Sequence, residues 1–385
     1  MKKFHSTPGA SIHKPSFLPP AIEPASTSTA AIIGSFPKGS MTSPRQVRNW
    51  LAFEKEYGGL TTDALSSHCI KQFFNNGGKA IWVVRIGTRP IKGVSPFLKG
   101  LSLLDRIVNF NILFIPQTEQ LPDVHAVKVM QAAIALVAKH RAMYVLDVPQ
   151  RDAPRQTVRA LTTWVNHQSN IHHPNVAMYV PRVQVPQSLK NAPQQTISAS
   201  GAMAGVLART DQQQGVWKAP AGTEAILHGV QNIEPTLTQS EMGQLTKFGI
   251  NPIRQTSPSQ FVAWGARTLS PSSEWQYLSV RRLGLFLEAS IQQGLGWVVG
   301  EPNDEPLWAH IRQAIEIFLQ SIFRQGAFQG QKAQEAYFVK CGRDTISASD
   351  QTAGIVNIMI GFAPLKPAEF MILNIQQKAK PFGQV

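Results

Sequence analysis

The chain has 385 residues, of which 43% are apolar and only 16% charged, and its formal net charge is +14. This length supports two or three domains with cores of their own. Its longest apolar runs, 355–360 and 370–373, are far shorter than the ~20 residues of a membrane-spanning helix, so we expect no membrane insertion. The positive charge predicts an acidic partner, but the basic residues are scattered and form no known nucleic-acid-binding module.

The first 27 residues predict an extended arm. They contain Pro8, Pro15, Pro19, Pro20 and Pro24, which together forbid a helix. Such a segment is either an uncommitted tail or an arm that folds only against another chain. Its opening residues lead into this Pro/Ser/Thr-rich stretch rather than into an apolar segment, so we expect no signal peptide and synthesis in a cytoplasm.

Residues 28–245 predict a layered α/β domain with βαβ units. Short apolar runs alternate with helical patterns, and such alternation implies a largely parallel sheet. The expected strands are 29–34, 80–86, 112–115, 143–146 and 176–180, and the expected helices are 47–53, 63–73, 123–141 and 155–165.

From residue 246 the pattern changes to α+β. We assign 246–366 to a C-terminal α+β domain and 367–385 to a C-terminal strand and arm. Asn303 or Asp304 is placed to cap a long helix that continues to Ile322. The other expected elements are a helix over 280–293 and strands at 250–253, 261–264, 337–341, 355–361 and 369–375.

No motif argues for catalysis, a metal or a cofactor. The NGGK segment at 76–79 follows a helix and precedes a strand, which is the reverse of a phosphate-binding loop. The acidic residues at 301–305 are better explained as helix capping than as a metal cluster. Asp147 ends a central strand, where α/β sheets often bind ligands, but no partner base or nucleophile accompanies it. Cys69 and Cys341 belong to no CxxC pair and are expected to be buried thiols.

Many ordered segments resemble contractile tail sheath proteins of bacteriophages, tailocins and related injection systems. The strongest are TAAIIG at 29–34, FFNNGGKAIWVVR at 73–85, GVLARTD at 205–211, WGARTLS at 264–270, EPNDEPLW at 301–308 and APLKPAEF at 363–370. The resemblance covers the chain from about residue 28 onward. Only the 14 residues 87–100 stand where larger sheath proteins carry an outer domain, so this chain resembles a minimal form.

The resemblance implies a structural subunit rather than an enzyme. Such subunits polymerise as stacked, hexameric rings around an inner tube and contract to drive the tube through a target envelope. Implied partners are other copies of the chain, the inner tube protein, and baseplate and tail terminator proteins; no nucleic acid is expected. The implied place is a bacterial host cytoplasm during assembly, and then a virion tail or a released particle.

The resemblance also implies site residues. The N- and C-terminal arms of this family add strands to sheets of neighbouring subunits. The predicted exchanged strands here are Gly9, Ala10, Ser11 and Ile12, and Phe370, Met371, Ile372, Leu373, Asn374 and Ile375. An acidic tube would face basic residues of the C-terminal helices, for which the candidates are Arg281, Arg282, Arg312 and Arg324.

Two other interpretations remain open from the residues alone. A basic, filament-forming protein that coats nucleic acid would show steeply salt-dependent DNA affinity. An α/β enzyme would use Asp147 at the end of its strand.

Overall fold

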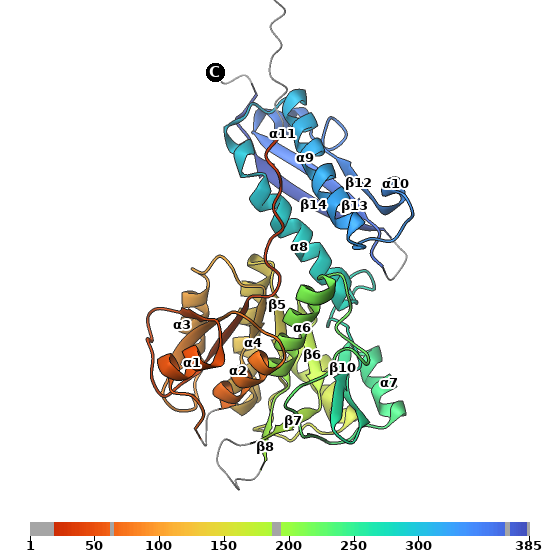
Figure 1. The fold of residues 1–385 in the computed structure, drawn as a ribbon. Helices are drawn as coiled ribbons and strands as arrows, with labels where there is room; N and C mark the ends of the chain where they lie inside the picture. The colour runs from red at the N-terminus through yellow and green to blue at the C-terminus, as the bar shows by residue number, and fades with distance from the viewer. Residues whose placement is uncertain (1–18, 62–64, 187–193, 366–369, 383–385) are drawn as a thin grey trace, which may run out of the picture.

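The computed structural model describes residues 19–61, 65–186, 194–365 and 370–382. An eight-stranded sheet forms the centre of the larger unit (Figure 1), in the order β11-β10-β6-β5-β4-β1-β3-β2. Its middle strands are parallel, and β2 and β11 close the edges in antiparallel pairing. The strands are β1 (Ala30–Ser35), β2 (Arg45–Val47), β3 (Ile81–Gly87), β4 (Ile112–Phe114), β5 (Met143–Leu146), β6 (Val176–Val180), β10 (Ile250–Ser257) and β11 (Gln260–Ala263).

Helices cover both faces of this sheet because its strands carry apolar side chains on both sides. In β1, Ala30 and Ile32 belong to one core cluster, and Ala31 and Ile33 belong to the other. The first face packs against α1 (Trp50–Tyr57), α2 (Leu65–Asn75) and α6 (Ser200–Gln214). The second packs against α3 (Ser95–Leu104), α4 (Asp123–Lys139), α5 (Val158–Thr163) and α7 (Gln239–Lys247).

Glycines let two of these helices approach each other closely. A Cβ atom on Gly201 would lie 2.2 Å from the carbonyl oxygen of Cys69, and one on Gly205 would lie 2.5 Å from that of Phe73. Both glycines belong to α6 and both carbonyls to α2. The contact between these helices therefore requires glycine at both positions.

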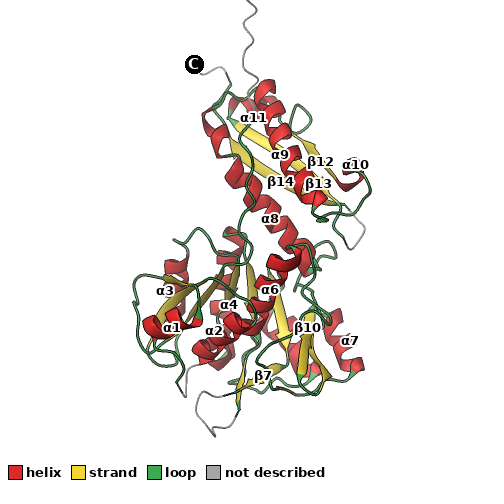
Figure 2. Cartoon of the chain, in the orientation of Figure 1, coloured by secondary structure: helices red, strands yellow, loops and turns green. Residues whose placement is uncertain are grey.

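The C-terminal unit packs two long helices on one face of a three-stranded antiparallel sheet (Figure 2). The N-cap of α9 is Asp304, whose side chain accepts a hydrogen bond from the backbone N–H of Leu307 at 3.1 Å, as predicted. The elements of this unit are α8 (Leu278–Gly294), α9 (Glu305–Arg324), α10 (Ala333–Ala336), α11 (Ala348–Thr352), β12 (Tyr337–Lys340), β13 (Ile355–Phe362) and β14 (Met371–Lys378).

Smaller elements complete the chain. A second antiparallel sheet has the order β8-β7-β9 and lies beside the end of β6. It consists of β7 (Arg182–Val185), β8 (Gln195–Ile197) and β9 (Asn232–Glu234), and the short helical turns are η1 (Pro116–Gln120), η2 (Trp164–Ser169) and η3 (Gly296–Gly300).

The structure confirms the mixed α/β character and the mostly parallel sheet. It also moves the junction between the two units. The strands that we expected at 250–253 and 261–264, in the C-terminal domain, are β10 and β11 of the eight-stranded sheet, where β10 runs parallel to β6. The junction therefore lies after β11 rather than at residue 246. The helix expected over 47–53 begins later, at Trp50, because the Asn49 side chain caps it.

Candidate functional site

The C-terminal strand pairs within its own chain. The predicted residues Phe370 to Ile375 lead into and begin β14, which pairs with β13 in antiparallel register from Met371↔Phe362 to Lys378↔Ile355. Phe370 and Ile372 remain 47% and 37% exposed. The predicted strand thus exists, and it has apolar surface left to cover. The predicted N-terminal strand, Gly9 to Ile12, lies outside the described residues.

The opposite edge of this sheet is open. Strand β12 pairs only with β13 among the described strands, and a groove of about 600 Å³ runs between it and α9. Ile317 of α9 lines the groove and is 55% exposed, and Phe338 and Val339 of β12 also line it. An open strand edge beside exposed apolar side chains can accept one more strand through backbone hydrogen bonds.

Arg282 forms a buried ion pair with Asp211. Its Nη1 and Nη2 donate to the two carboxylate oxygens at 2.7 and 2.6 Å, and the two side chains are only 4% and 2% exposed. Nη2 also donates to the backbone carbonyl of Thr27 at 3.0 Å. Arg282 lies on α8 and Asp211 on α6, so this pair joins the two units of the chain.

The other three predicted arginines differ in exposure. Arg281 stacks on the Trp275 ring, with its guanidinium 4.9 Å from the ring centroid, and is 15% exposed. Arg312 is 31% exposed and pairs with Glu305 at 3.2 Å. Arg324 is exposed in the last turn of α9 and forms no ion pair with a described residue. Arg324 and, less fully, Arg312 are therefore the ones available to a partner.

These four arginines do not account for the net charge. Residues 265–385 contain 11 Lys and Arg against 10 Asp and Glu, whereas residues 30–180 contain 17 against 8. The positive charge therefore lies mainly on the α/β unit.

The crevice where α/β sheets commonly bind ligands is filled in this protein. It lies between the carboxyl ends of β1 and β4, where the strand order reverses. The Gln117 side chain occupies it, and its Oε1 accepts hydrogen bonds from the N–H and hydroxyl of Ser35 at 2.8 and 3.0 Å. Gln117 is 1% exposed, so the crevice is sealed by the protein's own side chain.

Asp147 lies beside this crevice in a buried polar cluster. Its carboxylate accepts a hydrogen bond from the Ser200 hydroxyl, and it lines a cavity of about 30 Å³ together with Glu119 and Arg182. Arg182 donates to Glu119 at 2.8 Å. Burial raises the pKa of Asp147 to about 6 and that of Glu119 to about 7. The cavity has room for about two water molecules, so no substrate pocket accompanies Asp147.

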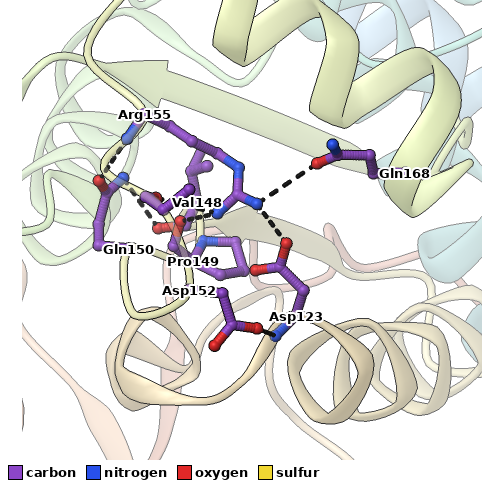
Figure 3. A network of polar contacts seen from close by, with 8 residues as sticks. Asp123, Val148, Pro149, Gln150, Asp152, Arg155 and Gln168 are labelled. Carbon is purple, nitrogen blue, oxygen red and sulfur yellow. Dashed lines mark hydrogen bonds and ion pairs between the residues drawn. The ribbon is translucent and has the colours of Figure 1, made fainter.

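Arg155 closes the loop over this cavity (Figure 3). Its guanidinium points to the Asp123 carboxylate at the start of α4 and to Gln168, and it donates to the Pro149 carbonyl at 2.5 Å. The Gln150 side chain accepts from the Arg155 backbone N–H at 2.9 Å. All of these contacts are made within the chain, so they hold the loop of residues 149–155 against the domain.

Other chemistry is absent from the described parts of the chain. Cys69 and Cys341 are buried free thiols, as predicted. Residues 19–61, 65–186, 194–365 and 370–382 contain no group of three or more His, Cys, Asp or Glu placed to hold a metal ion. In the same ranges no helix has the length and apolar character needed to cross a membrane.

Sequence analysis did not identify Asp211 or the β12 groove as functional. Asp211 ends the GVLARTD segment. It is the lone acidic residue on an otherwise uncharged helix face, and this was the sequence pattern that could have indicated its role. The groove depends on contacts between distant segments, α9 and β12, and no local pattern in the sequence indicates it.

Comparisons with known proteins find similarity to tail sheath proteins. Residues 270–378 match the model of the phage tail sheath C-terminal domain. A putative prophage major tail sheath protein of Pseudomonas aeruginosa (strain UCBPP-PA14) is 27% identical over 274 residues, which are 70% of this chain and 66% of the relative. The chain thus spans just under two thirds of that relative's length.

Solved structures match along almost the whole chain. The helical sheath of the anti-feeding prophage in its contracted state is 27% identical, with a TM-score of 0.76 over 97% of this chain and 100% of that one. The sheath complex of the extracellular contractile injection system PVC, also contracted, has a TM-score of 0.76 over 98% and 99% at 24% identity, and this supports the fold alone.

Proposed function

The chain belongs to the contractile tail sheath family, and from this premise we propose that it polymerises as stacked, hexameric rings around an inner tube and contracts to drive that tube through a cell envelope. This family is structural and non-enzymatic. The proposed place of the chain is the tail of a virion or a released injection particle, assembled in a bacterial cytoplasm. Baseplate and tail terminator proteins are the proposed partners at the two ends of the sheath.

The observation that carries this proposal is the three-stranded sheet of the C-terminal unit, which has an edge strand on each side. One edge is β14, which pairs only with β13 among the described strands and packs Met371, Leu373 and Ile375 into the core of its own unit. The ladder between them joins eight residue pairs. If β14 pairs with β13 of a neighbour instead, the same ladder forms between two chains. The exchange therefore changes connectivity with little change in pairing energy, as in domain swapping.

The other edge is β12, which has the apolar groove beside it. We assign the N-terminal strand of a neighbour, Gly9 to Ile12, to this edge. Backbone hydrogen bonds to β12 supply affinity that does not depend on the identity of the added side chains. Ile317 and Val339 offer apolar surface for every second side chain of the added strand. The added strand would cover the edge of β12, which in a single chain is unpaired among the described strands.

Contraction needs no chemical fuel in this scheme. Subunits that bury more apolar surface against each other in the contracted lattice gain ~25 cal/mol per Å², and the gain adds over every subunit. We propose Arg324 and Arg312 as the residues of α9 that face the tube. Arg281 and Arg282 are left out because their side chains are only 15% and 4% exposed, against 31% for Arg312.

Electron microscopy of the chain, expressed with and without its tube protein, tests this proposal. We expect hollow, striated cylinders. The Ile317→Asp variant should fold as a single chain but form no cylinders, because a carboxylate in the groove opposes strand addition. Val299→Asp is the matched control, since Val299 is also exposed (62%) but lies in η3, outside the groove. Monomeric wild-type protein under both conditions, with steeply salt-dependent DNA binding, would favour a nucleic-acid-coating protein instead.

A further inference from the structure

Residues 22–29 form a strap that runs along α8 before the chain enters β1. In Figure 1 this N-terminal segment, drawn in red, passes beside α8 from the C-terminal unit towards the α/β unit. Ile22 is 7% exposed and belongs to the core of the C-terminal unit. The N–H of Ala25 donates to the Ser290 hydroxyl at 3.0 Å, and the carbonyl of Thr27 accepts from Arg282. The strap thus contacts α8 at three points.

These contacts follow one stripe of the helix. Arg282, Ser290 and Gly294 are spaced by eight and four residues, so they follow one i, i+4 ridge of α8, which turns by ~40° around the helix axis every four residues. The twelve residues between the first and the last correspond to ~18 Å of helix axis. The five residue steps from Ile22 to Thr27 span a comparable ~17 Å when extended. The backbone of the strap is therefore fully extended along these residues of α8.

The stripe is shaped to hold this segment. A Cβ atom on Gly294 would lie 2.8 Å from Cγ1 of Ile22 and 3.0 Å from its Cβ, so only glycine leaves room for the Ile22 side chain. At the other end, Arg282 holds Thr27 and Asp211 together in one buried cluster. A packed side chain and a buried charge cluster fix the two ends of the strap.

We propose that the strap is the fixed anchor of the N-terminal arm, and that it stays docked on α8 while the sheath assembles and contracts. This inference rests on the proposed function, in which a neighbour holds the arm. A pull on the arm then reaches Ile22 first and passes into α8, so that strand β1 and its sheet carry none of the load.

Docking also limits how far the exchanged strand can reach. Ten residue steps separate Ile12 from Ile22, so the donated strand lies within ~35 Å of the anchor. If the strap were released, the free segment would extend to Ala30, and eighteen steps would allow ~60 Å. The anchor therefore restricts which neighbours the arm can join.

A disulfide between strap and helix tests whether the strap stays docked. The double variant Ile22→Cys/Gly294→Cys places two Cβ atoms ~3 Å apart, slightly closer than the ~3.8 Å mean of disulfides, so a small shift of the strap permits the bond. Diamide accepts the two hydrogens of the thiols and forms the bond. We expect the oxidised protein to form and contract cylinders as well as the reduced protein does. Assembly or contraction only after reduction would overturn the proposal.

A steric variant tests the anchor in the isolated chain. Labelling of the introduced thiol in Ile22→Cys should be slow, and adding Gly294→Val should speed it by a factor of ~10 or more as the strap leaves the helix. The native thiols of Cys69 and Cys341 are buried. Gly296→Val is the matched control, because no atom lies within 4 Å of a Cβ at that position. Equal, fast labelling in all three proteins would mean that the strap is not anchored.

The two experiments separate this inference from the proposed function. Should the wild-type chain form no cylinders, the proposed function fails, while thiol labelling still decides whether the strap is anchored. Should the wild type form cylinders that the disulfide-locked variant cannot, the function stands and the anchor fails.

Discussion

Replacing Arg282 with methionine should destabilise the protein strongly. The Asp211 carboxylate, 2% exposed, would keep its position between the two units but lose the two hydrogen bonds from the guanidinium. Removing one partner of a buried ion pair typically costs ~3–5 kcal/mol, because the remaining charge is left without compensation. The Thr27 carbonyl would also lose its donor.

This cost is large relative to the whole stability of a domain, which is typically ~5–15 kcal/mol. Urea unfolding followed by tryptophan fluorescence measures it, because Trp217 and Trp275 pack against the core of the C-terminal unit. The double variant Arg282→Met/Asp211→Leu should recover more than half of the loss, since replacing a buried pair with apolar side chains is often neutral or stabilising.

Lys139→Met provides the control. Lys139 also forms an ion pair, with Asp105 at 2.8 Å, but the two side chains are 64% and 37% exposed. Exposed pairs contribute ~0–1 kcal/mol. If Arg282→Met lowers the free energy of unfolding no more than Lys139→Met does, the reasoning about the buried pair is wrong.

Three further predictions concern other parts of the molecule. Burial outweighs the attraction of the partly exposed Arg182 and raises the pKa of Glu119 from 4.5 to about 7. The free energy of unfolding should therefore fall as the pH rises from 4.5 to 7, by up to ~1.4 kcal/mol per pH unit. Urea titrations of Glu119→Gln should show a flatter pH dependence. Gly361→Ala would place a Cβ 2.1 Å from the Phe338 ring, so thermal unfolding should show that the free energy of unfolding falls by ~1–3 kcal/mol. At Gly243, a Cβ would have no neighbour within 4 Å, so Gly243→Ala should raise the free energy of unfolding by ~0.5–1 kcal/mol. The two native cysteines should resist thiol labelling until the chain unfolds, because both are buried; rapid labelling of the folded protein would contradict this.

Local patterns were sufficient to predict the elements whose own residues decide their structure. The helix over 123–139 shows an apolar stripe, and the start of the other long helix shows two capping residues, Asn303 and Asp304, with Pro306 in the first turn, so each helix could be placed from sequence alone. The strands β5 and β6 are short apolar runs that each follow a helical segment. The resemblance of ordered segments to sheath proteins supplied the family, and the comparisons support it.

Sequence did not predict the helices α3 and α6, for a single physical reason. Each contains glycine inside the helix, which lowers helix propensity. Those glycines are needed by a partner element: Gly100 faces Ile33 and Ile86 of the sheet, with 2.8 Å from its would-be Cβ to each, and Gly201 faces the backbone of α2. Tertiary packing favours these helices against their local preference.

The amino-acid sequence by itself indicated a resemblance to sheath proteins, the α/β alternation, the capped helix and the existence of an apolar final strand, because each depends on residues close together in the chain. Only the tertiary structure decided that Arg282 is buried against Asp211, that β12 pairs with β13 alone among the described strands, and that Ile22 fills the space over Gly294. Those features join residues that are tens to hundreds of positions apart. Burial and charge pairing at such distances depend on how the whole chain packs, so no local pattern encodes them.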